Sequence, residues 1–441
     1  SLRETMAHKT VTAYQSAAIF LSSVIAAAAT FAISVIAAYF LSHSEFRQFQ
    51  SAFWPLVFGI YGITGAIQQE TTRAVGESLL QNPESRTHTN RLSYSAVAAL
   101  LGLGIAVIVV MTSPLWSSAF PSYPQMSVVL IAFGVVMYAV YAAVSGASAG
   151  RDSWYFYAAL GSGEALIRLA ATLAAVALSW HLLGFETAVV VASLIWLPCV
   201  VFSRTGRRVW HASIDVSSRR YARNIVMLML SSAGASILMT AFPFFLQFTT
   251  QEQSAQFNAL VAAIGVTRSP IMMPLQAFQG VAISAFLKHQ DHPLRALARP
   301  CLWVLGIGGF GALLAYLIGP FLFDIFYSKY AGLAPGMMLA ILTLESAIIA
   351  VLVLAGNLAI ALNMHRLYVS GWVCAAAMAL LLLHVPLDVV SRTELALGVA
   401  PLCGFTVILV GILRGSKVES RKSTDKSGLF QDAPAARHER P

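Results

Sequence analysis

Charged side chains are scarce in this sequence. Asp, Glu, Lys and Arg make up 11% of its 441 residues, whereas apolar residues make up 58% and the mean hydropathy is +0.72. A soluble domain has roughly 25% charged residues, so this chain has too little polar surface to coat a water-soluble globule. Its apolar residues come in blocks of about twenty, the length of a helix that crosses a hydrocarbon core of roughly 30 Å. We therefore expect an all-α polytopic membrane protein.

Several catalytic and metal-binding signatures are missing as well. The four cysteines stand singly in or beside apolar blocks, and their spacing fits neither a zinc site nor a disulfide framework. The sequence contains no P-loop, no H-E-x-x-H and no cluster of His and Cys. We therefore expect no metal and no cofactor. The acids of the predicted outer loops are scattered singly, which disfavours an enzyme such as a lipid-linked sugar transferase.

Twelve apolar stretches predict about twelve transmembrane helices. They cover residues 16–41, 51–75, 92–112, 126–149, 154–180, 185–203, 224–250, 254–287, 301–323, 336–362, 367–385 and 394–414. Lys and Arg gather in the connections after the even-numbered stretches, and the opposite connections hold little beyond Arg47, Lys329 and Arg392. By the positive-inside rule this asymmetry predicts a bacterial cytoplasmic (inner) membrane protein with both termini in the cytoplasm. The net charge of +9 then reflects topology and indicates no nucleic-acid partner.

A basic connection after the sixth stretch divides the chain. We expect one six-helix lobe at 1–203, a basic cytoplasmic connector at 204–223 and a second six-helix lobe at 224–414. Because six is even, both lobes enter the membrane from the same side, which predicts a parallel repeat around a central cavity. Residues 415–441 are polar and basic, and we expect a disordered tail that attracts membrane lipid headgroups.

Charged residues inside the predicted spans are costly and are candidates for a transport site. Arg268 has no acid within a helical turn and is followed by Pro270 and Pro274. A broken helix near the midplane is typical of transporter binding sites, and a guanidinium suits an anion such as phosphate. The alternative is that Arg268 pairs with Glu164 or Glu345 on another helix.

Other charges allow two interpretations each. Glu164 and Arg168 stand one turn apart and either line a polar cavity or neutralise each other to join two helices. Glu345 is either an ion-coupling site or the counter-charge of Arg268. Glu70 and Arg73 form either the inner mouth of a cavity or a pair that reaches the membrane surface.

Two segments carry a resemblance to a known family. One runs from Phe257-Asn258-Ala259-Leu260 through Arg268-Ser269-Pro270 to Gly280, and the other runs from Pro55 to Arg73 and contains Gln68-Gln69-Glu70-Thr71-Thr72-Arg73. With twelve spans in two halves, the chain resembles the Wzx-like polysaccharide flippases of the multidrug/oligosaccharidyl-lipid/polysaccharide (MOP) exporter superfamily. Lipid II flippases of that superfamily typically have fourteen spans, which disfavours lipid II as the cargo.

The resemblance implies a flippase that moves a polyprenyl-phosphate- or pyrophosphate-linked sugar to the outer leaflet by alternating access, for cell-envelope polysaccharide synthesis. It implies substrate contacts in the central cavity at Arg268, Arg168, Glu164, Gln276 and Arg73. Na⁺ or H⁺ coupling would then use Glu345, Glu164 or Glu70. We expect a monomer, with polysaccharide-synthesis enzymes as candidate partners.

The rival function is a MATE-like cation-coupled drug or metabolite antiporter of the same superfamily. A cavity that attracts cations should be acidic and aromatic, with little need for arginine inside the membrane. Two candidate cavity arginines weigh against this alternative. A scaffold role would leave the intramembrane charges without a purpose.

Overall fold

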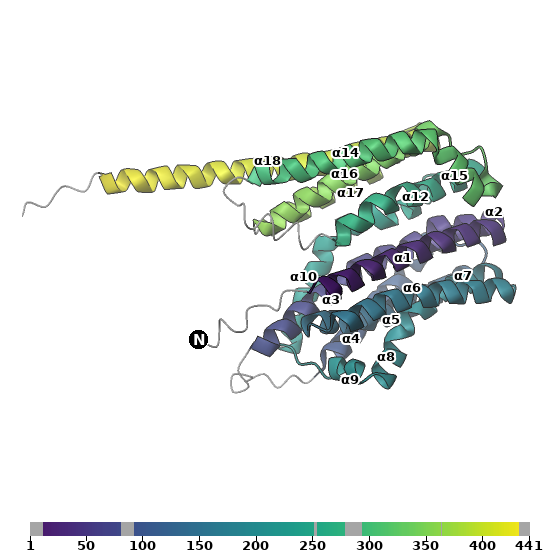
Figure 1. Ribbon diagram of the computed structural model, residues 1–441, viewed down its shortest axis with the longest axis horizontal. Helices are drawn as coiled ribbons and strands as arrows, with labels where there is room; N and C mark the ends of the chain where they lie inside the picture. Colours follow the sequence, from purple (N-terminus) through teal and green to yellow (C-terminus); the bar gives the residue numbers. More distant parts are fainter. Residues whose placement is uncertain (1–11, 81–91, 251–253, 278–292, 363, 432–441) are drawn as a thin grey trace, which may run out of the picture.

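The computed structural model describes residues 12–80, 92–250, 254–277, 293–362 and 364–431, and every regular element in these ranges is helical. Two bundles of long helices lie side by side along one axis (Figure 1). The apolar blocks explain the helices, because a backbone in lipid must satisfy its own hydrogen bonds. Polar residues set their starts: Thr12 and Gln15 form a capping box for the first helix, and Ser93 caps the fourth.

The first bundle, here the N-lobe, contains the chain up to Phe202. Its elements are α1 (Ala13–Phe40), α2 (His43–Arg47), the π-helix η1 (Gln48–Phe53), α3 (Trp54–Leu80), α4 (Tyr94–Trp116), η3 (Ser117–Ala119), α5 (Pro124–Gly150), α6 (Trp154–Ala177), α7 (His181–Ala192), η4 (Ser193–Ile195) and α8 (Trp196–Phe202). Helix α5 packs against α3 and α4, and α1 packs against α6. A short helix, α9 (Arg204–Trp210), follows in the predicted connector.

The second bundle, here the C-lobe, starts at Ser218. Its elements are α10 (Ser218–Ser236), the π-helix η5 (Ile237–Ala241), α11 (Phe242–Phe248), α12 (Ala255–Ala277), α14 (Pro293–Leu317), α15 (Gly319–Phe326), η6 (Ser328–Tyr330), α16 (Gly336–Ala361), α17 (His365–Leu382) and α18 (Val389–Gln431). Helix α16 is its centre and packs against α14, α12 and α18.

Within the described ranges, ten helical segments are long and apolar enough to cross a membrane. The other two predicted spans correspond to α3 and α12, which have 27 and 23 residues and are therefore about 40 and 35 Å long. Both are long enough to cross, but they carry more polar side chains, among them Gln68, Glu70 and Arg268. The prediction of about twelve membrane helices in two lobes is confirmed. The two most polar helices are equivalent, because α3 is the second predicted span of the first half and α12 is the second predicted span of the second half.

The two ends of the bundle differ. One end, here the basic end, carries Arg151, Arg207, Arg219, Arg299 and Arg366; the opposite end, here the distal end, carries α2, α7 and α15. At the distal end hydrogen bonds join the lobes: the amide of Asn258 donates to the carbonyl of His43 at 3.0 Å, and Lys329 Nζ donates to the carbonyl of Leu41 at 2.8 Å.

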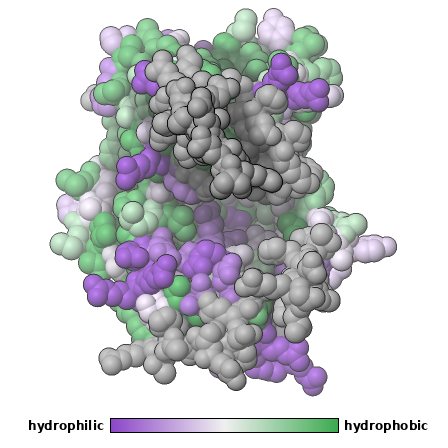
Figure 2. All heavy atoms as spheres, turned by 90° about the vertical axis from the view of Figure 1, so that its left-hand side faces the viewer, coloured by the Kyte–Doolittle hydropathy of each residue, from purple (hydrophilic) through white to green (hydrophobic). Residues whose placement is uncertain are grey.

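A hollow separates the lobes on the basic side. Figure 2 looks onto the basic end and shows hydrophilic residues inside this hollow. Beside it, α3 and α10 cross closely, because Gly59 and Gly62 face Ala241 and Ser236 with no room for a side chain. The lobes are therefore joined at the distal end and along the α3–α10 crossing.

Helix α18 continues past Arg414 to Gln431, into the segment for which the sequence predicts a disordered tail. The sequence offers a physical reason: this segment has no proline before Pro434, and its acidic and basic residues alternate at spacings that support a helix. Residues 432–441 lie outside the described part of the chain.

Candidate functional site

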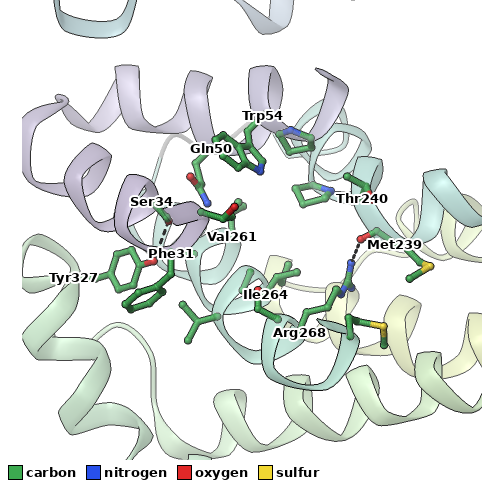
Figure 3. Close-up of a pocket in the computed structure, with 18 residues that line it drawn as sticks. Phe31, Ser34, Gln50, Trp54, Met239, Thr240, Val261, Ile264, Arg268 and Tyr327 are labelled. Atoms are coloured by element: carbon green, nitrogen blue, oxygen red, sulfur yellow. Dashed lines mark hydrogen bonds between the residues drawn. The ribbon is translucent and has the colours of Figure 1, made fainter. Parts of the chain in front are cut away.

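A cavity of about 260 Å³ lies between the two lobes. The N-lobe supplies its walls from α1, η1 and the start of α3, and the C-lobe supplies η5, α11 and α12 (Figure 3). The C-lobe residue Tyr327 closes one side, where its hydroxyl lies 2.9 Å from the hydroxyl of Ser34.

Arg268 is the one charged residue among the described residues that line this cavity. It is 9% exposed, and its Nη1 donates to the carbonyl of Met239 at 2.7 Å and to that of Leu238 at 3.3 Å. Its Nε–H is buried without a partner. In the part of the chain that the structure describes, no carboxylate forms a salt bridge with it. The guanidinium is thus positioned by neutral carbonyls and has no salt-bridged carboxylate among the described residues.

The local sequence explains why these carbonyls are free. Pro243 has no N–H, so it cannot donate to the carbonyl of Met239 four residues earlier. The preceding turn is the π-helix η5, whose spacing would pair Leu238 with the same absent N–H. Arg268 therefore supplies from α12 the donor that the proline removes.

The other cavity walls are mainly apolar and aromatic, with Phe31 and Trp54 on the N-lobe side. Gln50 and Thr240 add polar groups that can bond to hydroxyls (Figure 3). Our sequence reasoning missed these residues. The available signal was Gln50 within the aromatic run from Phe46 to Trp54, since π-helical turns occur often at functional sites.

Glu164 and Arg168 lie outside this cavity, in the interior of the N-lobe. Arg168 Nη2 donates to Glu164 Oε2 at 3.0 Å, and both residues are buried. The guanidinium of Arg168 lies 5.2 Å from the ring centre of Trp54 and 4.9 Å from that of Phe58. Trp54 therefore stands between Arg168 and the cavity, and the geometry favours the interpretation of a pair that joins α6 to α3.

Glu345 lies in the C-lobe, on the central helix α16 and opposite Gly398 of α18. It is 4% exposed, and its Oε2 has no hydrogen-bond partner among the described atoms. Glu345 is close enough to Arg268 for their charges to interact, but the two form no ion pair. Glu345 therefore acts as a counter-charge of Arg268 only across a distance longer than that of a salt bridge.

The remaining sequence candidates lie toward the basic end or outside the described residues. Glu70 accepts from Arg73 at 2.6 Å and from the amide of Asn224 at 2.8 Å, while Arg73 also pairs with Asp215 at 2.9 Å. These contacts link α3 to the connector and to α10, away from Arg268. The side chain of Gln276 lies outside the described residues.

Comparison with known proteins identifies relatives of this chain by sequence. No protein-family model matches it. Two Mycobacterium tuberculosis (strain H37Rv) proteins are similar along most of their length: the uncharacterized protein Rv3630 is 33% identical over 389 residues, which cover 87% of this chain and 88% of that protein. The uncharacterized protein Rv1510 is 33% identical over 401 residues, which cover 89% and 90%.

Solved structures share the fold at low identity. An inward-facing multidrug-resistance MATE family transporter of the MOP superfamily matches with a TM-score of 0.66 and 15% identity, covering 88% of this chain and 95% of that one. An outward-facing MATE transporter matches with a TM-score of 0.63 and 12% identity, covering 92% and 96%. A MOP superfamily transporter from Pyrococcus furiosus matches with a TM-score of 0.62 and 16% identity, covering 90% and 95%. The chain therefore belongs to the same family as Mycobacterium tuberculosis Rv3630 and Rv1510 and has the MOP superfamily fold.

Proposed function

We propose that this protein is a membrane transporter that flips an anionic lipid-linked sugar, carried on a polyprenyl phosphate or pyrophosphate, between leaflets. The observation that carries this proposal is Arg268, the one charged side chain among the described residues that line the cavity between the lobes. A buried guanidinium that forms no salt bridge with a described carboxylate favours an anionic occupant, because the anion would supply the ion pair that the described residues do not.

The geometry of Arg268 supports phosphate in particular. Its Nη1 is held by two main-chain carbonyls, which fixes the plane of the guanidinium, while its Nε–H is buried without a partner among the described residues. Such a fork recognises phosphate oxygens by charge-assisted hydrogen bonds. Gln50, Ser34 and Thr240 offer donors and acceptors for sugar hydroxyls.

The arrangement of the lobes supports alternating access. They are joined at the distal end and along the α3–α10 crossing, a hollow lies between them beside that crossing on the basic side, and related folds are known in inward-facing and outward-facing forms. The excess of arginine at the basic end supports a cytoplasmic location for it. The substrate would enter at the cytoplasmic side and leave when the distal contacts break and the basic side closes.

The proteins that share this fold bear on the charge of the cargo. The Pyrococcus furiosus transporter is described as having a binding pocket of reverse polarity that suggests a different function. The MATE neighbours support the second candidate, a cation-coupled drug antiporter, and the aromatic walls at Phe31 and Trp54 would suit an organic cation. Arg268 opposes that cargo by charge repulsion.

The test is flipping of fluorescent polyprenyl-phosphate-linked sugars in proteoliposomes. We compare the wild type with Arg268→Gln and with the matched control Arg299→Gln, which changes an arginine of α14 outside the cavity. Loss of a charge-assisted contact should slow flipping about tenfold to a hundredfold in Arg268→Gln only. Wild-type vesicles that flip no such lipid, but exchange a cationic dye against Na⁺ or H⁺, would identify the antiporter instead.

A further inference from the structure

A basic hollow lies on the flank of the N-lobe, apart from the central cavity. It is an open space of about 520 Å³ beside α9 and the turn between α5 and α6, on the side of the N-lobe that faces away from the C-lobe (Figure 1). In the part of the chain that the structure describes, no carboxylate forms a salt bridge with its basic side chains. Such a concentration of positive charge favours an anionic occupant. Every described residue that lines the hollow is basic: Arg151, Arg204, Arg207, Arg208 and His211.

The local structure holds the arginines of α9 in place. Helix α9 folds back on α8, and we call the two together the α8–α9 hairpin. The indole rings of Trp196 and Trp210 stack with their centres 5.6 Å apart, and a Cβ at Gly206 would collide with the carbonyl of Cys199. Arg207 Nη1 also donates to a main-chain carbonyl at the end of α8 at 2.7 Å. The hairpin is therefore closely packed, and its guanidinium groups lie on a firm support.

The position of the hairpin in the chain places it where lipid meets water. Its α8 arm ends the apolar segment His181–Phe202, which is long enough to cross a membrane. Three side chains of this arm, here the apolar row, are turned outward, since Leu197, Val201 and Phe202 are 48%, 50% and 83% exposed. Tryptophan and arginine are common at this boundary. Because Arg207 bonds to the carbonyl of Val201, the basic hollow and the apolar row adjoin.

We propose that the basic hollow binds the headgroup of an anionic phospholipid from the leaflet at the basic end. The lipid phosphate lies between Arg151 and the arginines of α9, and the acyl chains lie along the apolar row. Phosphate oxygens accept charge-assisted hydrogen bonds from guanidinium groups, and basic pockets at the membrane surface are typical of this recognition. The acyl chains meanwhile stay in the bilayer, so the lipid binds without leaving it.

The apolar row decides between a lipid and a soluble anion. A free phosphate or an acidic protein segment matches the charge of the hollow but gains nothing from Phe202, whereas an acyl chain packs against it. The lipid is a bound component of the protein and not its cargo, because no residue of the hairpin, all of which the structure describes, lines the central cavity. The inference is thus independent of the proposed function. The bound lipid anchors the start of the connector between the lobes.

The connector supplies two matched variants, each of which removes three exposed arginines. The hairpin triple removes those that line the hollow, and the control triple removes three from the start of α10, which do not line it. Because all six side chains are exposed, both variants should fold, and melting in a neutral detergent checks this. The hairpin triple is Arg204→Gln, Arg207→Gln and Arg208→Gln. The control triple is Arg219→Gln, Arg220→Gln and Arg223→Gln.

The measurement is binding of fluorescent phosphatidylglycerol to the purified full chain in a neutral detergent. The hairpin triple should bind about tenfold more weakly than the wild type, and the control triple should bind within about twofold of it, because only the first loses charge-assisted contacts. Unlabelled phosphatidylglycerol should compete, and phosphatidylcholine should not. Equal binding by the two triples would overturn the proposal in favour of diffuse attraction to a basic surface. Equal competition by phosphatidylcholine would overturn it in favour of contact with hydrocarbon alone.

A second comparison separates a lipid from a soluble anion. Phe202→Asn shortens the apolar row and should weaken binding of phosphatidylglycerol about threefold, while the competition by inorganic phosphate should stay weak in both proteins. Equal affinity of Phe202→Asn and the wild type would remove α8 from the site. Inorganic phosphate that displaces the fluorescent lipid as strongly as unlabelled phosphatidylglycerol does would assign the hollow to a free anion. Displacement of the same strength by a polyglutamate peptide would assign it to an acidic protein partner.

Discussion

The guanidinium of Arg268 donates through Nη1 to the main-chain carbonyl of Met239 at 2.7 Å (Figure 3). This bond joins two C-lobe helices where one is interrupted by a π-turn and Pro243. The arginine therefore has two roles in one place, since it completes a broken backbone and presents its charge to the cavity. The interruption also makes η5 a natural bending point next to the site.

The first prediction concerns that interruption. Pro243→Ala restores an N–H that can donate to the Met239 carbonyl, so the helix should gain about 1 kcal/mol of stability. Arg268 then loses its anchor, and the bend at η5 straightens. We expect a higher melting temperature in detergent together with slower flipping, measured on the same preparation. Unchanged melting and unchanged flipping would remove Pro243 from the hinge.

The second prediction separates a structural pair from a substrate site. Glu164→Gln leaves the buried Arg168 without its partner and should cost about 3 kcal/mol of unfolding free energy. The double variant Glu164→Gln with Arg168→Met removes both charges and should recover most of that loss. A double-mutant cycle of melting in detergent measures the coupling.

Transport in the double variant adds a second criterion. Because Trp54 stands between the pair and the cavity, a folded double variant should flip lipid at a rate near that of the wild type. A stable double variant without transport would instead return Arg168 and Glu164 to the substrate path.

Much of the architecture could be predicted because lipid imposes simple rules. Apolar blocks and the distribution of arginine were enough to predict two six-helix lobes. The sequence also singled out Arg268, whose isolation from acids is visible in the chain itself. The partners of Arg268 could not be predicted, because they are main-chain carbonyls of a segment some thirty residues away. Every residue has such a carbonyl, so the residue type does not show which one accepts from Arg268.

Two arginines that the sequence offered as substrate contacts, Arg168 and Arg73, lie outside the cavity between the lobes. Arg168 and Arg268 are both arginines within apolar helices, and only Arg168 has an acid, Glu164, one turn away. Sequence does not show which of them faces the cavity; packing does, since a Trp side chain lies between Arg168 and the cavity while Arg268 lines it. Arg73 was likewise assigned to the cavity, but its depth along α3 places it beside the connector, where Asp215 pairs with it.

The third prediction tests the α3–α10 crossing. A Cβ at Gly62 would lie 2.5 Å from Ser236 Oγ, whereas a Cβ at Gly65, one turn later on the same helix, would meet nothing within 4 Å. Gly62→Ala should force the Ser236 hydroxyl to rotate or the helices to shift, and should destabilise the protein by about 1 kcal/mol. Gly65→Ala should be neutral or slightly stabilising. Thermal unfolding in detergent compares them, and equal melting temperatures would show that this crossing adapts without strain.

The last prediction concerns the seam at the distal end. There the hydroxyl of Ser51 in η1 donates to the side-chain carbonyl of Gln247 in α11, and Arg47 donates to the carbonyl of Thr250 at 3.0 Å. Both contacts join the N-lobe to the C-lobe, so alternating access requires them to break in each cycle. A link across this seam should therefore hold the protein open at the basic end.

The experiment places cysteines at Ser51 and Gln247 in a chain whose native cysteines are replaced by alanine, and joins them with a short bifunctional thiol reagent that a reductant cleaves. Substrate binding should survive the link, because the cavity stays open toward the basic end, while flipping stops and returns on reduction. Either single cysteine variant treated with the same reagent is the control. Flipping at the full rate through an intact link would mean that the distal seam does not open during transport and that the cargo leaves by another path.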